Sequence, residues 1–140
     1  MTEIRLPWAL YQQLIRDAQA EPDAEVCGLL AGTVDTCNAI YPIKNISPDP
    51  QYSFCMDPQA QLAAMNTMGA MKQTMLGIYH SHPTTGAMPS RRDILGATYP
   101  EVAYLIISLT VLEQPQVAAF VLVEDHFDQI ALVVGRLTPA

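Results

Sequence analysis

The chain has 140 residues, of which 50% are hydrophobic and 15% are charged. This length fits a single domain, and this hydrophobic content is enough to bury a core, so an intrinsically disordered chain is excluded. Acidic residues outnumber basic ones by 14 to 7, giving a formal net charge of −7, and because such a surface repels phosphates and anionic lipid headgroups, we expect neither nucleic acid nor a membrane as a partner.

The N-terminal residues contain no basic segment followed by an apolar stretch, so the sequence predicts no secretory signal and a cytoplasmic protein. The strongest apolar run, residues 102–112, is too short to cross a membrane. The 3 cysteines are an odd number without a Cys-x-x-Cys spacing, which predicts neither a disulfide framework nor a cysteine-rich zinc site. We expect each of them to be a small apolar core residue: Cys27, Cys37 and Cys55.

The first predicted element is an amphipathic helix that ends before Pro22, because apolar residues recur at spacings of three and four: Trp8, Tyr11, Leu14, Ile15 and Ala18. Residues 25–32 are too short and too rich in glycine for a long helix, which indicates a buried strand, and a second strand follows over residues 36–43. The prolines of residues 48–50 break the chain before a short predicted strand, residues 52–56.

A second helix is predicted to begin at Asp57-Pro58, where a capping side chain precedes a proline at the first helical position. Its apolar stripe is more typical of a core than of a cofactor site: Leu62, Met65, Met68 and Met71. Residues 75–79 predict a central strand that leads into the polar residues 80–93, and a short helix is expected to start near Ser90.

Three apolar runs complete the chain, at residues 102–109, 117–123 and 129–134, and each predicts a strand. The last two are expected to form a hairpin through residues 124–126. Strands mixed with two or three helices on one sheet predict an α/β or α+β fold, a single domain over residues 1–140 with a mixed central sheet flanked by helices.

The polar segment carries the candidate chemistry. His80 and His82 are two residues apart, so on an extended strand both rings lie on the same side of the sheet and can share one metal ion. Neutral imidazoles suit zinc, and a catalytic zinc needs a third protein ligand, which the next acid downstream, Asp93, can supply. Each part also has a structural explanation: Ser90-x-x-Asp93 is a helix capping box, and a His-x-His pair is often two exposed loop residues.

His80-Ser81-His82-Pro83 followed by Ser90-x-x-Asp93 resembles the motif of the JAMM (JAB1/MPN/Mov34) zinc metallopeptidases, and no position departs from the pattern. Glu25 stands where that family has its upstream glutamate, although without the resemblance it would be read as a surface acid in a turn. Further segments resemble the small free-standing bacterial members, so the likeness covers most of the chain: residues 45–50, 52–57, 77–79 and 104–108.

The resemblance implies a cytidine deaminase-like JAB1/MPN fold and a hydrolase of peptide or isopeptide bonds. It implies that His80, His82 and Asp93 bind Zn²⁺, that Glu25 acts as general base and acid, and that Ser90 helps to stabilise the oxyanion. The small bacterial members are associated with ubiquitin-like sulfur-carrier proteins, whose C-terminal tails they trim or release from adducts. Such a protein or its conjugate is therefore the expected substrate.

Other functions are weighed against this one. A nucleobase deaminase would need a Pro-Cys-x-x-Cys motif, which is absent, and a cupin would need an acid soon after its His-x-His. A non-catalytic JAB1/MPN binding module stays open as the alternative, although the intact ligand set argues against it. His126 is expected to be solvated, and Arg91 and Arg92 are more simply exposed helix residues than partners of a substrate carboxylate. Whether residues 84–89 gate the site stays open.

Overall fold

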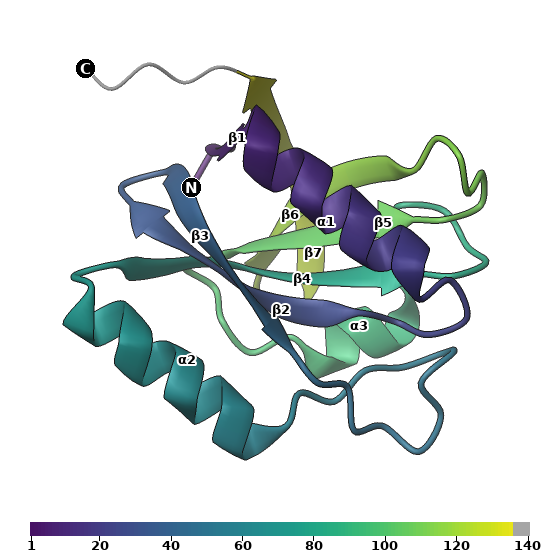
Figure 1. The fold of residues 1–140 in the computed structure, drawn as a ribbon. Coiled ribbons are helices and arrows are strands. Elements are labelled where there is room, and N and C mark those ends of the chain that lie inside the picture. Colours follow the sequence, from purple (N-terminus) through teal and green to yellow (C-terminus); the bar gives the residue numbers. More distant parts are fainter. Residues whose placement is uncertain (136–140) are drawn as a thin grey trace.

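The computed structural model describes residues 1–135, whose helices and strands form one unit around a mixed sheet (Figure 1). The helices are α1 (Trp8–Ala20), α2 (Pro58–Ala70) and α3 (Arg91–Gly96). The strands are β1 (Glu3–Pro7), β2 (Cys27–Thr33), β3 (Thr36–Ile43), β4 (Thr74–His82), β5 (Ala103–Ser108), β6 (Gln116–Val123) and β7 (His126–Gly135). This architecture confirms the expected α+β class. The expected domain of residues 1–140 also includes residues 136–140, which lie outside the described part of the chain.

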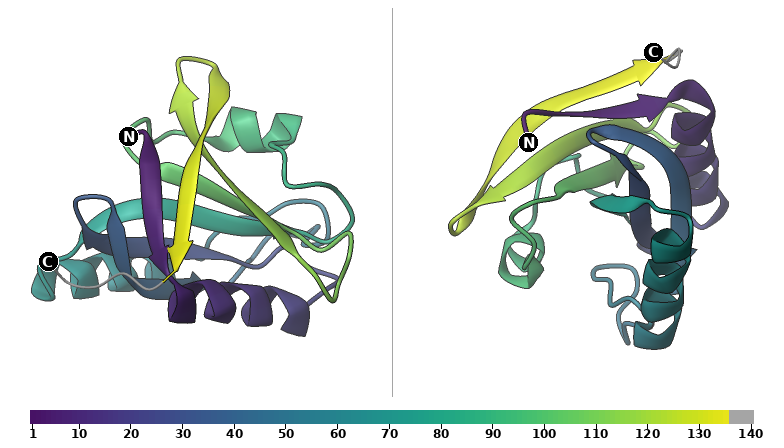
Figure 2. Two further views of the ribbon diagram at one scale, coloured as in Figure 1. Left: turned by 90° about the horizontal axis from the view of Figure 1, so that it is seen from above. Right: turned by 90° about the vertical axis from the view of Figure 1, so that its left-hand side faces the viewer.

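The sheet closes on itself, with the strand order β1-β3-β2-β4-β5-β6-β7. β1 closes it, because it pairs in parallel with β3 on one side and with β7 on the other. β4 and β5 are also parallel, whereas the other neighbouring strands are antiparallel. Figure 2 shows the strong curvature that this closure requires. β4 lies between β2 and β5, so it is a central strand, as predicted.

Two apolar cores lie on opposite faces of the sheet, because successive residues of a strand point to opposite sides. One core packs α1 against the strands through Leu14 and Ala18. The other packs α2 through Ala64 and Met68, together with Ile78 of β4. His80 and His82 lie two and four residues after Ile78, so they share the face that α2 covers.

Several predicted elements are confirmed. The first helix ends at Ala20, before Pro22, and β3 has the predicted bounds. α2 begins as expected, with the Asp57 carboxylate accepting a hydrogen bond from the Gln59 amide at 3.4 Å. The hairpin through residues 124–126 joins β6 and β7. None of the helices described over residues 1–135 is long and apolar enough to span a membrane.

One strand was not predicted, and one predicted strand does not form. No strand was expected before the first helix, but Ile4 and Leu6 of β1 are fully buried in the α1 core. A five-residue segment that ends in proline is too short to be recognised as a strand from the sequence when its partner strands are not known. Conversely, residues 52–56 do not form a strand. Only a single bridge joins Asn45 and Met56, and side-chain hydrogen bonds organise the segment instead.

The predicted apolar stripe of α2 is also partly wrong. Met68 is buried and Met65 is half-buried, but Leu62 and Met71 are 60% and 64% exposed. Leu62 lies two residues before the buried Ala64, which is about 200° around the helix, so it points away from the sheet. Of the three cysteines, Cys27 and Cys37 are buried as expected, whereas Cys55 is exposed and is not a core residue.

Candidate metal centre

β4 carries two histidines into the interior. The strand runs through His82, and His80 is paired with Cys27 of β2 and with Ile106 of β5. The two histidines are only 2% and 3% exposed. Their rings lie on the same side of the strand, with centroids 4.9 Å apart, which confirms the orientation expected from their spacing.

α3 supplies the third group, and its local start positions it. Ser90 is the N-cap: its hydroxyl oxygen accepts from the Asp93 amide at 3.1 Å, and Asp93 Oδ2 accepts from the Ser90 amide at 2.8 Å. The capping box predicted as a structural explanation is therefore formed. It also directs the Asp93 carboxylate towards β4, so the structural role and the candidate ligand role belong to the same side chain.

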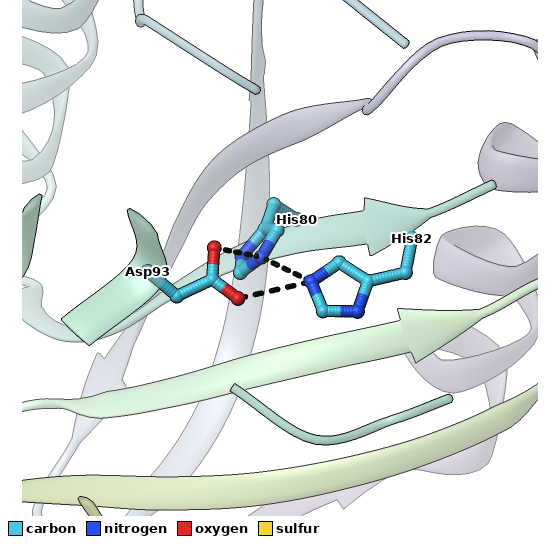
Figure 3. Close-up of side chains that lie close together, drawn as sticks. All are labelled: His80, His82 and Asp93. Carbon is cyan, nitrogen blue, oxygen red and sulfur yellow. Dashed lines mark hydrogen bonds and ion pairs between the residues drawn. The ribbon is translucent and has the colours of Figure 1, made fainter. Parts of the chain in front are cut away.

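The three side chains converge on one point (Figure 3). His80 Nε2 lies 3.0 Å from Asp93 Oδ1, and His82 Nε2 lies 2.9 Å from Asp93 Oδ2. The two Nε2 atoms are 3.1 Å apart. Two nitrogen lone pairs repel each other at this distance, and one proton cannot bridge all three pairs of atoms. A single cation can bridge all three pairs, so this donor set of two imidazoles and a carboxylate fits a divalent metal ion.

The charges of the three groups depend on one another. Burial opposes ionisation of Asp93, but the hydrogen bonds from His80 and His82 hold the pKa of its carboxyl well below the ordinary range. Burial lowers the pKa of His80. For His82, burial also disfavours the charge, but the Asp93 and Gly86 oxygens outweigh it and raise the pKa. Asp93 is therefore an anion, as a metal ligand requires.

The two histidines are supported differently. His82 Nδ1 donates to the Gly86 carbonyl oxygen at 2.9 Å, so in the neutral ring the lone pair lies on Nε2 and faces the centre. Among the described residues, His80 Nδ1 is buried and has no hydrogen-bond partner. Its ring instead stacks on Phe54, with centroids 4.5 Å apart and an interplanar angle of 25°. Ring packing thus orients His80, whereas a hydrogen bond orients His82.

Glu25 lies beside this centre but outside any strand, two residues before β2. It is 6% exposed, and its Oε1 has no hydrogen-bond partner among the described residues. Burial raises the pKa of its carboxyl to about 7, an effect that nearby His82 partly offsets. Glu25, His82 and Ser90 line one groove, so all five predicted site residues gather around the centre, with Ser90 at its exposed edge.

A second, mostly apolar cavity of about 140 Å³ adjoins the centre on the side of His80 and Asp93. Its walls come from α3, β5, β7 and the segment before α2: Ser53, Phe54, Arg92, Gly96, Ala97, Tyr104, Ile106 and Phe127. Arg92 lines both this cavity and the Glu25 groove, and its guanidinium lies 3.4 Å from the Tyr52 carbonyl oxygen and 3.6 Å from Asp49. The centre therefore lies between two hollows that share Arg92 as a lining residue.

Other residues singled out in the sequence have different positions. The His126 side chain is 54% exposed and lies near Asp125 and Asp128 of its own hairpin, as expected for a solvated residue. Arg91 lines the Glu25 groove and is exposed. Two residues near the centre were not predicted from the sequence: Phe54, which lies in the expected strand of residues 52–56, and Asn45, whose side chain organises the residues next to the centre. No periodicity or spacing identifies either one.

Comparison with known proteins places this geometry in a family. Residues 7–123 match the model of prokaryotic homologs of the JAB domain. A desampylase of Haloferax volcanii is 36% identical over 93 residues, which are 65% of this chain and 67% of that protein. A probable TtuB-protein conjugate cleaving protease of Thermus thermophilus is 33% identical over 129 residues, 92% of this chain and 81% of that protein. A CysO-cysteine peptidase of Mycobacterium tuberculosis is 32% identical over 101 residues, 71% of this chain and 68% of that protein.

Comparison with solved structures supports the same fold. A Desulfitobacterium hafniense protein solved in solution matches with a TM-score of 0.84 and 34% identity, covering 94% of this chain and 92% of that one. A JAB1/MPN domain protein from Archaeoglobus fulgidus matches with a TM-score of 0.63 over 95% of this chain and 100% of that one, and at 14% identity it supports the fold alone. The chain therefore belongs to the family of prokaryotic homologs of the JAB domain, and it has the JAB1/MPN fold.

Proposed function

We propose that this protein is a zinc-dependent metallopeptidase that hydrolyses a peptide or isopeptide bond at the C-terminal tail of a ubiquitin-like sulfur-carrier protein. One observation carries the proposal. The Nε2 atoms of His80 and His82 and the carboxylate of Asp93 face a common point with separations of 2.9 to 3.1 Å, beside the buried carboxylate of Glu25.

The ligand set supports zinc. Catalytic zinc is typically held by three protein ligands drawn from histidine and carboxylate side chains, with one position left open. In a tetrahedral site with bonds of about 2.0 Å, neighbouring ligand atoms are about 3.3 Å apart, slightly more than the separations of 2.9 to 3.1 Å here. His80, His82 and Asp93 would hold the ion. Zinc bound there supplies Lewis acidity, which polarises a carbonyl group and lowers the pKa of water to about 7.

Glu25 is proposed to move the proton. A carboxylate whose pKa lies near neutrality can accept a proton from an attacking water and return it to a leaving amine in the same cycle. Burial raises the pKa of Glu25 to about 7, within the useful range. Its Oε1 is buried and makes no hydrogen bond to the described residues, so no donor of the described chain competes for this oxygen.

Ser90 is proposed to donate a hydrogen bond to the oxyanion of the tetrahedral intermediate. Its oxygen accepts the capping bond from the Asp93 amide, and a hydroxyl that accepts in this way can still donate its own proton. Ser90 is exposed at the edge of the Glu25 groove, where a substrate carbonyl can reach it. A preorganised donor of this kind stabilises the transition state without reorganisation.

The names of the relatives support the substrate class. The Thermus thermophilus protein is described as cleaving TtuB-protein conjugates, and the Mycobacterium tuberculosis protein as a CysO-cysteine peptidase. These descriptions concern hydrolases that act on conjugates or adducts of other proteins. The motif resemblance likewise associates small bacterial members with ubiquitin-like sulfur carriers. We therefore take the tail of such a carrier to be the acyl side of the scissile bond.

The test uses the ubiquitin-like carrier proteins encoded in the same genome. Each is prepared with a C-terminal peptide extension and as a conjugate to a lysine amine, incubated with the zinc-loaded protein, and weighed by mass spectrometry. We expect release of the extension or the conjugate by the native protein and none by Glu25→Gln. Metal content is measured in parallel against a His80→Ala/His82→Ala variant. A native protein that holds no metal and cleaves none of these substrates would favour the non-catalytic binding module instead.

A further inference from the structure

The Glu25 backbone is held by residues far along the chain. Because Glu25 precedes β2, no strand partner binds its amide or its carbonyl group. Its amide donates to the Pro50 carbonyl oxygen at 2.7 Å, and its carbonyl oxygen accepts from Asn45 Nδ2 at 2.9 Å. Both partners belong to the loop between β3 and α2. The position of the proposed proton carrier therefore depends on that loop.

Asn45 organises this loop with its whole amide group. Nδ2 also donates to the Ser53 carbonyl oxygen at 3.1 Å, and Oδ1 accepts from the amides of Ser47 at 2.9 Å and Cys55 at 3.0 Å. A primary amide has two donor hydrogens and two acceptor lone pairs, so all four are used. Since the partners are two carbonyl oxygens and two amide groups, the orientation of the side chain is fixed. An aspartate there would keep the two accepted bonds and lose the two donated ones.

We propose that Asn45 is the positioning residue that holds Glu25 at the metal centre, an inference that rests on the proposed function. It bonds directly to the Glu25 backbone, and it organises the turn from which Pro50 binds the Glu25 amide. The same loop carries Phe54, the ring that stacks on His80. Asn45 thus links the proton carrier to the surroundings of one metal ligand, although none of its own hydrogen bonds described here reaches a metal ligand.

Separate hydrogen bonds hold the start of β2 against β4. The hydroxyl of the fully buried Ser81 accepts from the Val26 amide at 2.9 Å, and the Ser81 amide donates to the Val26 carbonyl oxygen at 3.0 Å. These bonds join Val26, the residue before β2, to β4 without Asn45. Loss of the Asn45 side chain should therefore release Glu25 and the loop while β2, β4 and the two histidines keep their places.

The test compares Asn45→Ala and Asn45→Asp with Asn38→Ala. Asn38 is an exposed residue of β3 whose side chain accepts one hydrogen bond, from Gln73, so it is the matched control. We expect kcat on the carrier substrate to fall by about 10- to 100-fold in both Asn45 variants, as for a misplaced catalytic group, while KM and the zinc content at saturating zinc stay near those of the native protein. Asn38→Ala should keep the native kcat.

Amide hydrogen exchange, measured by NMR on the full chain, gives a second readout that needs no substrate. We expect the Glu25 amide to exchange about tenfold faster or more in Asn45→Ala, because its acceptor in the loop is released. In Asn45→Asp the amides of Ser47 and Cys55 should stay protected although kcat falls, which separates positioning of Glu25 from folding of the loop.

The inference is overturned if either Asn45 variant keeps the native kcat, or if Glu25 exchange in Asn45→Ala equals that of Asn38→Ala. It is also overturned if the loss of activity only follows a loss of zinc or of the folded state. These failures differ from failure of the proposed function, in which the native protein itself cleaves no carrier substrate. In that case the exchange measurement alone decides whether Asn45 positions Glu25.

Discussion

Replacing Glu25 by glutamine should abolish hydrolysis and at the same time stabilise the metal-free protein at alkaline pH. Glu25 is 6% exposed and its Oε1 has no hydrogen-bond partner among the described residues, so the native state holds a poorly solvated charge whenever Glu25 is ionised. Burial is what raises the pKa of this carboxyl from 4.5 to about 7. Glutamine has nearly the same shape and carries no charge, so it removes this cost.

The size and sign of the effect follow from that pKa. Each pH unit between 4.5 and about 7 corresponds to about 1.4 kcal/mol, so the ionised group destabilises the native state by at most about 3.5 kcal/mol. Below pH 4.5 the carboxyl is neutral in both states and the substitution changes little. Because the native pKa is the higher one, the stability that Glu25 contributes is lost as the pH rises towards 7. The advantage of Glu25→Gln should therefore grow with pH and level off above about 7.

Urea unfolding followed by circular dichroism, on EDTA-treated protein at pH 5 and pH 8.5, measures this difference. We expect Glu25→Gln to be more stable than the native protein by about 2 to 3 kcal/mol at the higher pH and by less than about 1 kcal/mol at the lower. Glu113→Gln, which removes an exposed carboxylate, is the control and should change little at either pH. A Glu25→Gln protein that is less stable than the native one at pH 8.5, or equally stabilised at both pH values, would refute the reasoning.

Three further substitutions test other parts of the structure. Phe54→Ala removes the ring stacked on His80 and should weaken zinc binding by about 10- to 100-fold, as for other groups that orient a ligand, and calorimetric titration checks this. An unchanged affinity would mean that the ring does not orient His80. Ser90→Ala should lower kcat by about 100- to 1000-fold without abolishing it. It should also lower the free energy of unfolding by about 1 kcal/mol, because the helix cap is lost. A native kcat would exclude Ser90 as an oxyanion donor. Gly28→Ala should destabilise the protein by about 1 to 3 kcal/mol in urea unfolding, because a β-carbon there collides with the Tyr79 side chain, whereas Gly69→Ala in α2, with open space around it, should be neutral or stabilising.

Local patterns predicted much of the fold because their causes are local. The three-to-four spacing of apolar residues marked α1, and the Asp57-Pro58 start marked α2. The ends of β3 and the hairpin between β6 and β7 were also predicted, since turns and alternation lie within a few residues of one another. The two-residue spacing of His80 and His82 was enough to place both rings on one side of β4.

The sequence also predicted part of the candidate site. The motif identified the three residues that converge in space, His80, His82 and Asp93, because a histidine pair and a helix capping box are short-range features. It did not identify Phe54 or Asn45. Their importance comes from contacts with His80 and with the Glu25 backbone, which are 26 and 20 residues away in the chain.

By itself the sequence determined the helix starts, most strands, the metal-binding pattern and the family resemblance, all of which depend on the order and spacing of neighbouring residues. The tertiary structure decided that β1 closes the sheet between β3 and β7, that Met68 is buried while Leu62 is exposed, and that Glu25 Oε1 is buried without a hydrogen-bond partner among the described residues. Each of these depends on which distant segments meet, and the free energy of burying a group is set by those neighbours and not by its own place in the chain.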